Sequence, residues 1–269
     1  MRAVPFALNV PKSRTSAFVI HLCLSILVFS TLVAAMLVYW FPGKLFMMDG
    51  GWAGLKLVAM VDLVLGPALT LILFKPGKPG LKFDLSAIAA VQIAALAYGF
   101  YTTYNQRTVA VVFADNEFAT VSAHDIKQAN AALLERDVQP KPVPRAGAFD
   151  IPVLVTPAPE NFGEYLADIL NGFPSGHERS DLYVSINGPR DDMQPHVQPV
   201  EKLKEIGALP SIEKEINKFQ LTLDEIEVYE FRARYANGYA LFDPEKAVIV
   251  SYVNHTSTKS SDTVAENLE

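Results

Sequence analysis

One carboxylate lies within a stretch that otherwise suits a lipid bilayer. In VAMVDLVLGPALT, residues 58–70, Asp62 has hydrophobic neighbours on both sides. An acid at the centre of a bilayer costs about 2.5 kcal/mol or more, so intramembrane acids usually face protein or water. Gly66 lies one helical turn later and permits close approach of another helix. Pro67 removes a backbone donor and frees the carbonyl of Leu63, which predicts a kink just past the acid.

Gln92, in the next apolar stretch, is the expected partner of Asp62. The two residues differ in depth by about 6 Å, which a modest tilt or a water molecule would bridge. Three interpretations stay open: a protonated acid that hydrogen-bonds to Gln92 or to freed backbone and stabilises the helices, a site for a partner's membrane helix, and a proton or ion relay. A relay normally uses a chain of acids, and this stretch has one. The candidate intramembrane site therefore comprises Asp62, Gly66, Pro67 and Gln92.

A second candidate is the loop MMDGGW, residues 47–52, which combines an acid, two glycines and a tryptophan. A helix-starting turn at the membrane interface explains this composition. The alternative is a small contact surface next to the membrane, formed by Asp49, Gly50, Gly51 and Trp52.

The polar second half of the chain has no recognisable catalytic motif. The sequence contains no G-x-S-x-G, Walker A or H-E-x-x-H pattern. Asp191, Asp192 and His196 are conceivable metal ligands, but their Pro-rich loop RDDMQPHVQP favours a solvated turn. We expect no catalytic residue, metal or cofactor, and hence a protein that is not an enzyme.

Three apolar segments are long enough to cross a membrane as helices, since about 20 residues span about 30 Å of hydrocarbon. They cover residues 16–41, 53–74 and 85–104 and follow a tail of residues 1–15. We expect them to form a three-helix α bundle.

The charges of the short connections predict the orientation. The tail contains the bases Arg2, Lys12 and Arg14 and no acid. The 75–84 loop contains Lys75, Lys78 and Lys82 against Asp84, whereas the 42–51 loop is neutral, with Lys44 against Asp49. The positive-inside bias therefore places the tail and the 75–84 loop in the cytoplasm. Three crossings then put the C-terminal domain outside it. Residues 105–269 contain 15 bases and 26 acids, which makes nucleic acid a poor partner.

Residues 105–253 read as an extracytoplasmic α+β domain. Residues 226–253 contain alternating apolar residues and the hairpin turn signal Asn237-Gly238, which together predict an antiparallel meander. Ser122 opens a predicted capping box, S-x-x-D. The other predicted strands are Thr108–Ala114, Phe118–Val121, Ile151–Val155 and Leu182–Ile186, and the predicted helices are Ser122–Arg136, Phe162–Leu170, Val200–Ile206 and Ile212–Phe219. The polar tail, residues 254–269, is expected to be disordered.

The chain resembles the type IV pilin accessory proteins of the TfpX/TfpZ type. The resemblance covers about the first 115 residues and is loose beyond them. It is carried by five stretches in a specific order: SRTSAFVIHL (13–22), DGGW (49–52), VDLVLGPALTLILF (61–74), LKFDLSAIAAVQIAALAYGFY (81–101) and RTVAVVFAD (107–115).

This resemblance implies a bacterial inner-membrane protein, N-terminus cytoplasmic and C-terminal domain periplasmic, that assists a cognate major type IV pilin. Pilin levels, pilus assembly or twitching motility would depend on it. The resemblance implies no catalytic residues and no cofactor. A pilin waits in the membrane through one hydrophobic helix with its globular head outside, so a groove beside Asp62 and an external domain would suit it. Two alternatives stay open: a membrane enzyme that modifies pilin, and a periplasmic sensor with a membrane anchor.

Overall fold

The computed structural model describes residues 13–41, 43–144, 150–188 and 190–255. Most of the expected tail (residues 1–12) and most of the expected disordered C-terminus (residues 256–269) lie outside the described residues. The chain divides into two compact units. The membrane unit contains Met1–Met36 and Trp52–Tyr104, and the C-terminal domain contains Leu37–Gly51 and Asn105–Glu269.

Three helical stretches are long and apolar enough to cross a membrane: Arg14–Trp40, Gly51–Leu73 and Leu81–Asn105. The first is α1 (Arg14–Ala35) continued by a π-helix, η1 (Met36–Trp40). The second joins α3 (Gly51–Ala59), a π-helix η2 (Met60–Leu65) and α4 (Gly66–Leu73), and the third is α5 (Leu81–Asn105). This confirms the expected apolar helices at the N-terminal end of the chain.

The second stretch changes from α to π geometry around Asp62. The N–H of Gly66 donates to the carbonyl of Val61, five residues earlier. Pro67 follows with no N–H of its own, so the wide turn precedes the proline. The predicted irregularity is therefore a π-turn that includes the acid, rather than a kink after it.

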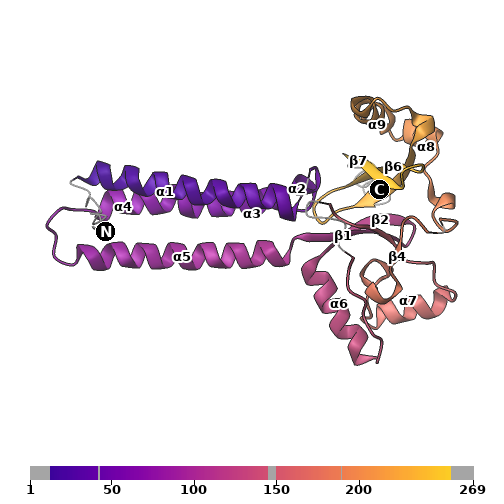
Figure 1. Cartoon of the computed structure of the whole chain (residues 1–269), viewed down its shortest axis with the longest axis horizontal. Helices are drawn as coiled ribbons and strands as arrows, with labels where there is room; N and C mark the ends of the chain where they lie inside the picture. The colour runs from indigo at the N-terminus through magenta and orange to yellow at the C-terminus, as the bar shows by residue number, and fades with distance from the viewer. Residues whose placement is uncertain (1–12, 42, 145–149, 189, 256–269) are drawn as a thin grey trace, which may run out of the picture. The chain divides into compact units, whose positions relative to one another are not determined.

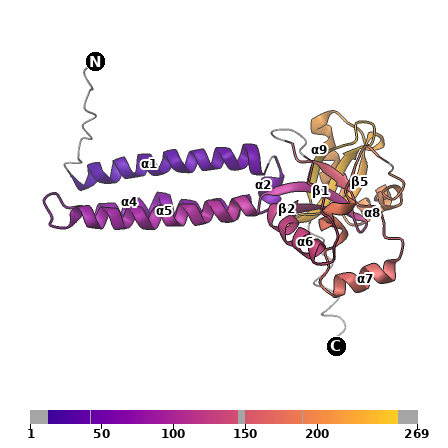
Figure 2. The ribbon, with the colours of Figure 1, turned by 60° about the horizontal axis from the view of Figure 1, so that its bottom comes forward.

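The membrane unit buries little of its apolar surface, as lipid-facing helices do. α1 packs along η2 and α4 (Figures 1 and 2). α5 contacts the second stretch through Gln92, which lies against Gly66, and through Gly99, which lies beside Val58. Large apolar side chains elsewhere on the helices are exposed, among them Leu27, Leu57, Ile72, Val91 and Ile93.

The C-terminal domain is built on one seven-stranded sheet with the order β4-β3-β1-β2-β5-β6-β7. Antiparallel pairing joins β1 to β2, β3 to β4, β5 to β6 and β6 to β7, and parallel pairing joins β1 to β3 and β2 to β5. The strands are β1 (Thr108–Ala114), β2 (Glu117–Ser122), β3 (Val153–Val155), β4 (Val184–Ser185), β5 (Glu227–Arg232), β6 (Asn237–Asp243) and β7 (Val248–Asn254).

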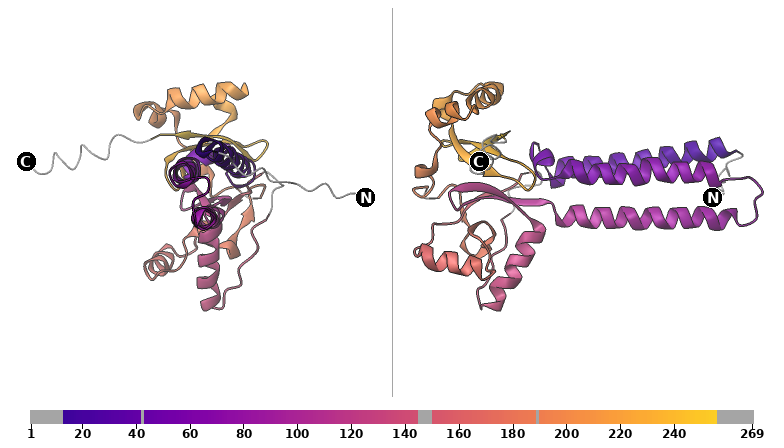
Figure 3. Two further views of the ribbon diagram at one scale, coloured as in Figure 1. Left: turned by 90° about the vertical axis from the view of Figure 1, so that its left-hand side faces the viewer. Right: turned by 180° about the vertical axis from the view of Figure 1, so that it is seen from behind.

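Helices lie at both ends of this sheet. Figure 3 shows α8 and α9 near its β6–β7 end and α6 and α7 near the other end. The capping box that starts α6 is present: Ser122 Oγ accepts from the N–H of Asp125, whose carboxylate accepts from the N–H of Ser122. The helices are α2 (Leu45–Met48), α6 (Ala123–Glu135), α7 (Phe162–Leu170), α8 (Val200–Glu205) and α9 (Leu209–Ile216), with short 3-10 turns η3 to η7 between them.

Apolar residues form cores on both faces of the sheet. One cluster contains Phe113, Phe118, Tyr229 and Phe242, whose rings meet edge-on or tilted at 5.1–6.3 Å between centroids. The alternate residues of the strands contact the helices instead. At the β5–β7 end they pack against α8 and α9, in a cluster built around Leu203, Ile212, Val228 and Leu241. At the β1–β2 end they pack against α6, in a cluster built around Val112, Val121, Ile126 and Leu154.

Three details of this domain differ from the sequence prediction. Asn237 and Gly238 pair within β6, and the turn is residues 233–236, closed by Ala233 N–H to the Ala236 carbonyl. A Cβ on Gly238 would lie 1.9 Å from the Val253 carbonyl oxygen, so this glycine serves close strand packing. β4 is two residues long, shorter than the predicted strand Leu182–Ile186, whose first residue belongs to η4 (Ser180–Leu182). Finally, β7 includes Asn254, so the meander extends past residue 253.

Candidate functional site

The carboxylate of Asp62 is buried and half satisfied. Its side chain is 4% exposed within the membrane unit. Oδ1 accepts hydrogen bonds of 3.3 Å from Ser25 Oγ on α1 and from Gln92 Nε2 on α5. Oδ2 has no partner among the described residues. Since an unpaired buried polar atom is costly, Oδ2 is the unsatisfied group of this cluster.

Gly66 makes the contact between Asp62 and Gln92 possible. A Cβ at this position would lie 1.9 Å from Gln92 Nε2, so any larger residue would displace the amide. Pro67 is buried beside it at the start of α4. The structure thus brings together the predicted residues, with Asp62, Gly66 and Gln92 in contact and Pro67 adjacent.

Two polar residues near Asp62, Ser25 and Thr70, were not assigned to it by the sequence pattern, and a third, His21, was a weaker candidate because it lies nearer the cytoplasmic side. Ser25 donates to Asp62, and His21, one turn earlier on α1, lies with Nδ1 2.6 Å from Thr70 Oγ1. Thr70 also donates to the carbonyl of Gly66 at 3.1 Å. The available signal was helical spacing: His21 and Ser25 are four residues apart, as are Gly66 and Thr70.

A small apolar cavity of about 110 Å³ lies between the second stretch and α5. It is lined by Val58 and Val61 on one side and by Ala95 and Gly99 on the other, with Leu57, Leu96 and Tyr98 completing the lining. Small residues at such a place allow close backbone approach between membrane helices.

Residues 47–51 of the MMDGGW loop are part of the C-terminal domain, and the acid of this loop is turned inward. Asp49 is 2% exposed. Its Oδ1 accepts from Thr120 Oγ1 at 2.7 Å and from the N–H of Arg234 at 3.0 Å, and its Oδ2 accepts from the Thr108 hydroxyl. These donors occupy both carboxylate oxygens, so this residue ties the loop to the sheet rather than facing a partner.

The neighbouring loop residues are also packed inside the domain. Gly50 has φ +86°, and a Cβ there would lie 2.2 Å from the Tyr235 ring; one on Gly51 would lie 2.6 Å from the Phe46 ring. Trp52, which belongs to the membrane unit, is 48% exposed with the Lys56 ammonium 5.5 Å from its ring centroid. Of the four predicted contact residues, Asp49, Gly50 and Gly51 are therefore structural, and Trp52 alone is exposed.

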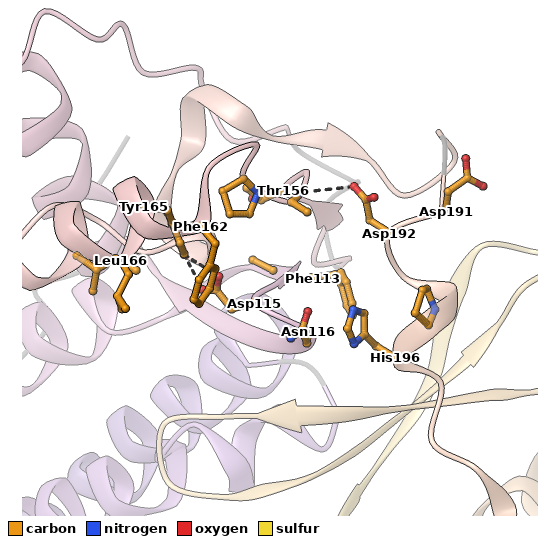
Figure 4. A pocket seen from close by; sticks show the side chains of 15 residues that line it. Phe113, Asp115, Asn116, Thr156, Phe162, Tyr165, Leu166, Asp191, Asp192 and His196 are labelled. Atoms are coloured by element: carbon orange, nitrogen blue, oxygen red, sulfur yellow. Dashed lines mark hydrogen bonds between the residues drawn. The ribbon is translucent and has the colours of Figure 1, made fainter.

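The C-terminal domain also has a pocket of about 620 Å³ beside α7, which Figure 4 shows. Its wall contains Phe113 and Asp115 from the β1–β2 hairpin and Phe162, Tyr165 and Leu166 from α7. This helix starts at Asn161, whose side chain accepts from the N–H groups of Gly163 and Glu164.

Tyr165 connects α7 to the hairpin. Its hydroxyl donates to the Asp115 carboxylate, with both oxygens within 2.8 Å, and accepts from the N–H of Gly176 at 2.8 Å. Burial, reinforced by the Asp115 carboxylate, raises the pKa of Tyr165 to about 12. Burial lowers the pKa of His177, an effect that Asp115 at 3.6 Å partly offsets.

The three conceivable metal ligands, Asp191, Asp192 and His196, all line this pocket. Figure 4 shows them spread along the 191–196 segment, with Asp192 accepting from the N–H of Ala158 at 3.3 Å. Within residues 13–255, leaving aside the gaps named above, no group of three His, Cys, Asp or Glu side chains is arranged to hold a metal ion. The predicted solvated turn fits this placement.

Comparison with known proteins gives relatives that are named fimbrial assembly proteins. The chain is 36% identical over 110 residues to the fimbrial assembly protein of serogroups C1 and C2 of Dichelobacter nodosus, a segment that is 40% of this chain and 83% of that protein. It is also 36% identical over 110 residues to the serogroup I and serogroup E1 fimbrial assembly proteins of the same organism, spanning 42% of each.

No family model matches the chain, and no solved structure matches it. The serogroup C1 and C2 protein nevertheless aligns over most of its own length. The chain therefore belongs to the family of fimbrial assembly proteins.

Proposed function

We propose that this protein is an inner-membrane accessory protein of the TfpX/TfpZ type that binds a cognate major type IV pilin and assists its assembly. The observation that carries the proposal is the kinship with fimbrial assembly proteins in a chain with three helices able to cross a membrane. Pilin stability and pilus dynamics, including twitching motility, are the properties that such binding would control.

The expected topology has physical support within the C-terminal domain. Residues 43–51 belong to the same compact unit as residues 105–255. Lys44 Nζ donates to the Tyr252 carbonyl and forms an ion pair of 2.7 Å with Glu215, while Leu45 and Met48 join the core. This packing supports the proposal that residues 43–51 and the C-terminal domain lie on the same side of the membrane, as three crossings require. With the positive-inside bias, that side would be the periplasm.

In this proposal the pilin's hydrophobic helix lies against the three-helix anchor near Asp62. The unpartnered Oδ2 and the small-residue cavity beside Gly99 support this role, because close approach and one unsatisfied polar atom are what a partner helix would use. The C-terminal domain would contact the pilin head. The proposed action is binding rather than catalysis.

In-cell photocrosslinking tests the proposal. A photoreactive amino acid replaces Leu57, which is 61% exposed and lines the membrane cavity, and in a control it replaces Ile72, which is 67% exposed on α4. We expect an adduct with the major pilin from position 57 and a much weaker one from position 72. If neither position captures pilin while both variants are abundant in the membrane, the proposed function is wrong.

A further inference from the structure

α7 is an amphipathic helix whose apolar side faces no core. None of its residues is buried. Phe162, Leu166 and Leu170 are 67%, 44% and 78% exposed. The helix is attached instead by polar contacts, chiefly Tyr165 to Asp115 and an ion pair of 2.6 Å between Asp168 and Arg136. Exposed apolar side chains gathered beside a pocket mark a surface that binds something.

The hollow beside α7 is lined by both apolar and acidic residues. Its apolar lining comprises Phe113, Ala158, Pro159, Phe162, Leu166 and Ile169. An adjoining hollow of about 440 Å³ continues it past Asp115 and Tyr165. Together they are lined by one arginine, Arg179, and by the carboxylates of Asp115, Glu160, Glu164, Asp168, Asp191 and Asp192.

Several of these carboxylates have no cation to balance them. In the described part of the chain, no ion pair involves Asp191, Asp192, Glu160 or Glu164, whereas Arg179 is engaged with Asp181 at 2.7 Å. An apolar groove with uncompensated negative charges is complementary to a segment with Lys or Arg flanking an apolar side chain.

We propose that the groove between α7 and the β1–β2 hairpin binds a basic segment of the pilin's globular head, with an apolar side chain between Phe162 and Phe113. This inference rests on the proposed function and specifies where the C-terminal domain contacts its partner. A second copy of the chain fits the charge poorly, because residues 105–269 carry 15 bases against 26 acids. The segment 256–269 also fits poorly, with one lysine and three acids.

The test uses the full-length protein in cells that express its cognate major pilin. A photoreactive amino acid replaces Leu166 in the groove, and in a control it replaces Phe219, which is equally exposed at 46% but lies outside the groove. Mass spectrometry then identifies the crosslinked peptide. We expect a pilin peptide with net positive charge from position 166 and no pilin adduct from position 219.

Charge neutralisation provides an independent readout. Asp191→Asn with Asp192→Asn removes two exposed charges of the groove and keeps the side-chain oxygen that accepts from Ala158. It should lower the yield of the position 166 adduct by about threefold or more, because exposed charges steer association. Glu201→Gln with Glu205→Gln, two exposed acids on α8, should leave the yield unchanged.

The outcomes separate the two proposals. Pilin captured from position 57 in the membrane but not from position 166 keeps the proposed function and overturns the groove. Pilin captured from neither position overturns both. An acidic pilin peptide, an adduct with residues 145–149 of the same chain, or an adduct with a second copy at position 166 also overturns the groove assignment.

Discussion

Two buried aspartates, one in each unit, differ in how their oxygens are satisfied. Asp49 in the C-terminal domain and Asp62 in the membrane unit are 2% and 4% exposed. Asp49 accepts three hydrogen bonds spread over both oxygens. Asp62 accepts two, both at Oδ1 and both at 3.3 Å, and its Oδ2 has no partner in the described structure.

In the proposed function, this difference separates an internal role for Asp49 from a partner-binding role for Asp62. A carboxylate whose oxygens are fully used stabilises its own fold, since each donor would otherwise be buried unpaired. A carboxylate with one unused oxygen keeps an unsatisfied acceptor, and in the proposed function a partner helix supplies the missing contact. In this proposal, the same residue type therefore stabilises the fold in one unit and binds a partner in the other.

The largest expected effect is on the stability of the C-terminal domain in Asp49→Ala. The change leaves the Thr108 and Thr120 hydroxyls and the N–H of Arg234 without their acceptor, so we expect a loss of about 4 kcal/mol. Thermal unfolding or protease resistance of the full-length protein in detergent measures it. Asp224→Ala, at an exposed position, should cost less than about 0.5 kcal/mol. A fully stable Asp49→Ala protein would remove the contrast between the two acids.

The next effect is a loss of stability in acid that involves Glu215. Burial alone would raise the pKa of Glu215, but hydrogen bonds from Lys44, Lys218 and Ser251 lower it to about 2. A lowered folded-state pKa means that the stabilisation is complete above the ordinary value of 4.5 and is lost as the pH falls towards 2. Because both lysines are partly exposed to water, we expect about 2 kcal/mol rather than the full value of the shift.

Denaturant unfolding at pH 6 and at pH 2.5 checks this expectation. Glu215→Gln should already be less stable at pH 6, and the remaining acid dependence of the domain should be smaller by about 2 kcal/mol. An identical pH dependence in the two proteins would show that the contact of Lys44 with Glu215 does not hold the loop to α9.

The smallest expected effect is on the membrane unit in Gln92→Leu. It removes one of two donors to Asp62, and hydrogen bonds between membrane helices average under about 1 kcal/mol. Titration with SDS, followed by circular dichroism, should show a shift of that size or less, and Ile93→Leu, which is 66% exposed, should show none. A loss comparable to that of Asp49→Ala would make the Asp62 cluster mainly structural.

Much of the fold is predictable from local pattern. The apolar stretches, the capping box at Ser122, the helix Phe162–Leu170 and the strand Thr108–Ala114 follow from residue type and spacing, and the structure confirms them. The predicted turn at Asn237-Gly238 is wrong, because these two residues pair within β6. An Asn-Gly pair forms a hairpin turn only when both residues adopt positive φ. Gly238 is needed instead because β7 approaches too closely for a side chain.

The candidate sites depended on contacts far apart in sequence. Pairing Asp62 with Gln92 required only helix length and depth, so it was predictable. The inward turn of Asp49 was not, because its donors lie 59 to 185 residues away. The groove beside α7 was not predicted, because it is formed by segments far apart in the sequence, α7, the β1–β2 hairpin and the 191–196 segment.

In the proposed function, the unpartnered oxygen of Asp62 contributes to binding of the pilin helix. Its most direct test is the amount of cognate pilin that copurifies with full-length Asp62→Leu, compared with Ser25→Ala, which removes one donor but leaves Oδ2 unchanged. We expect about tenfold less pilin with Asp62→Leu at equal membrane abundance, and little change with Ser25→Ala. Wild-type amounts of pilin on a folded Asp62→Leu protein would contradict the account.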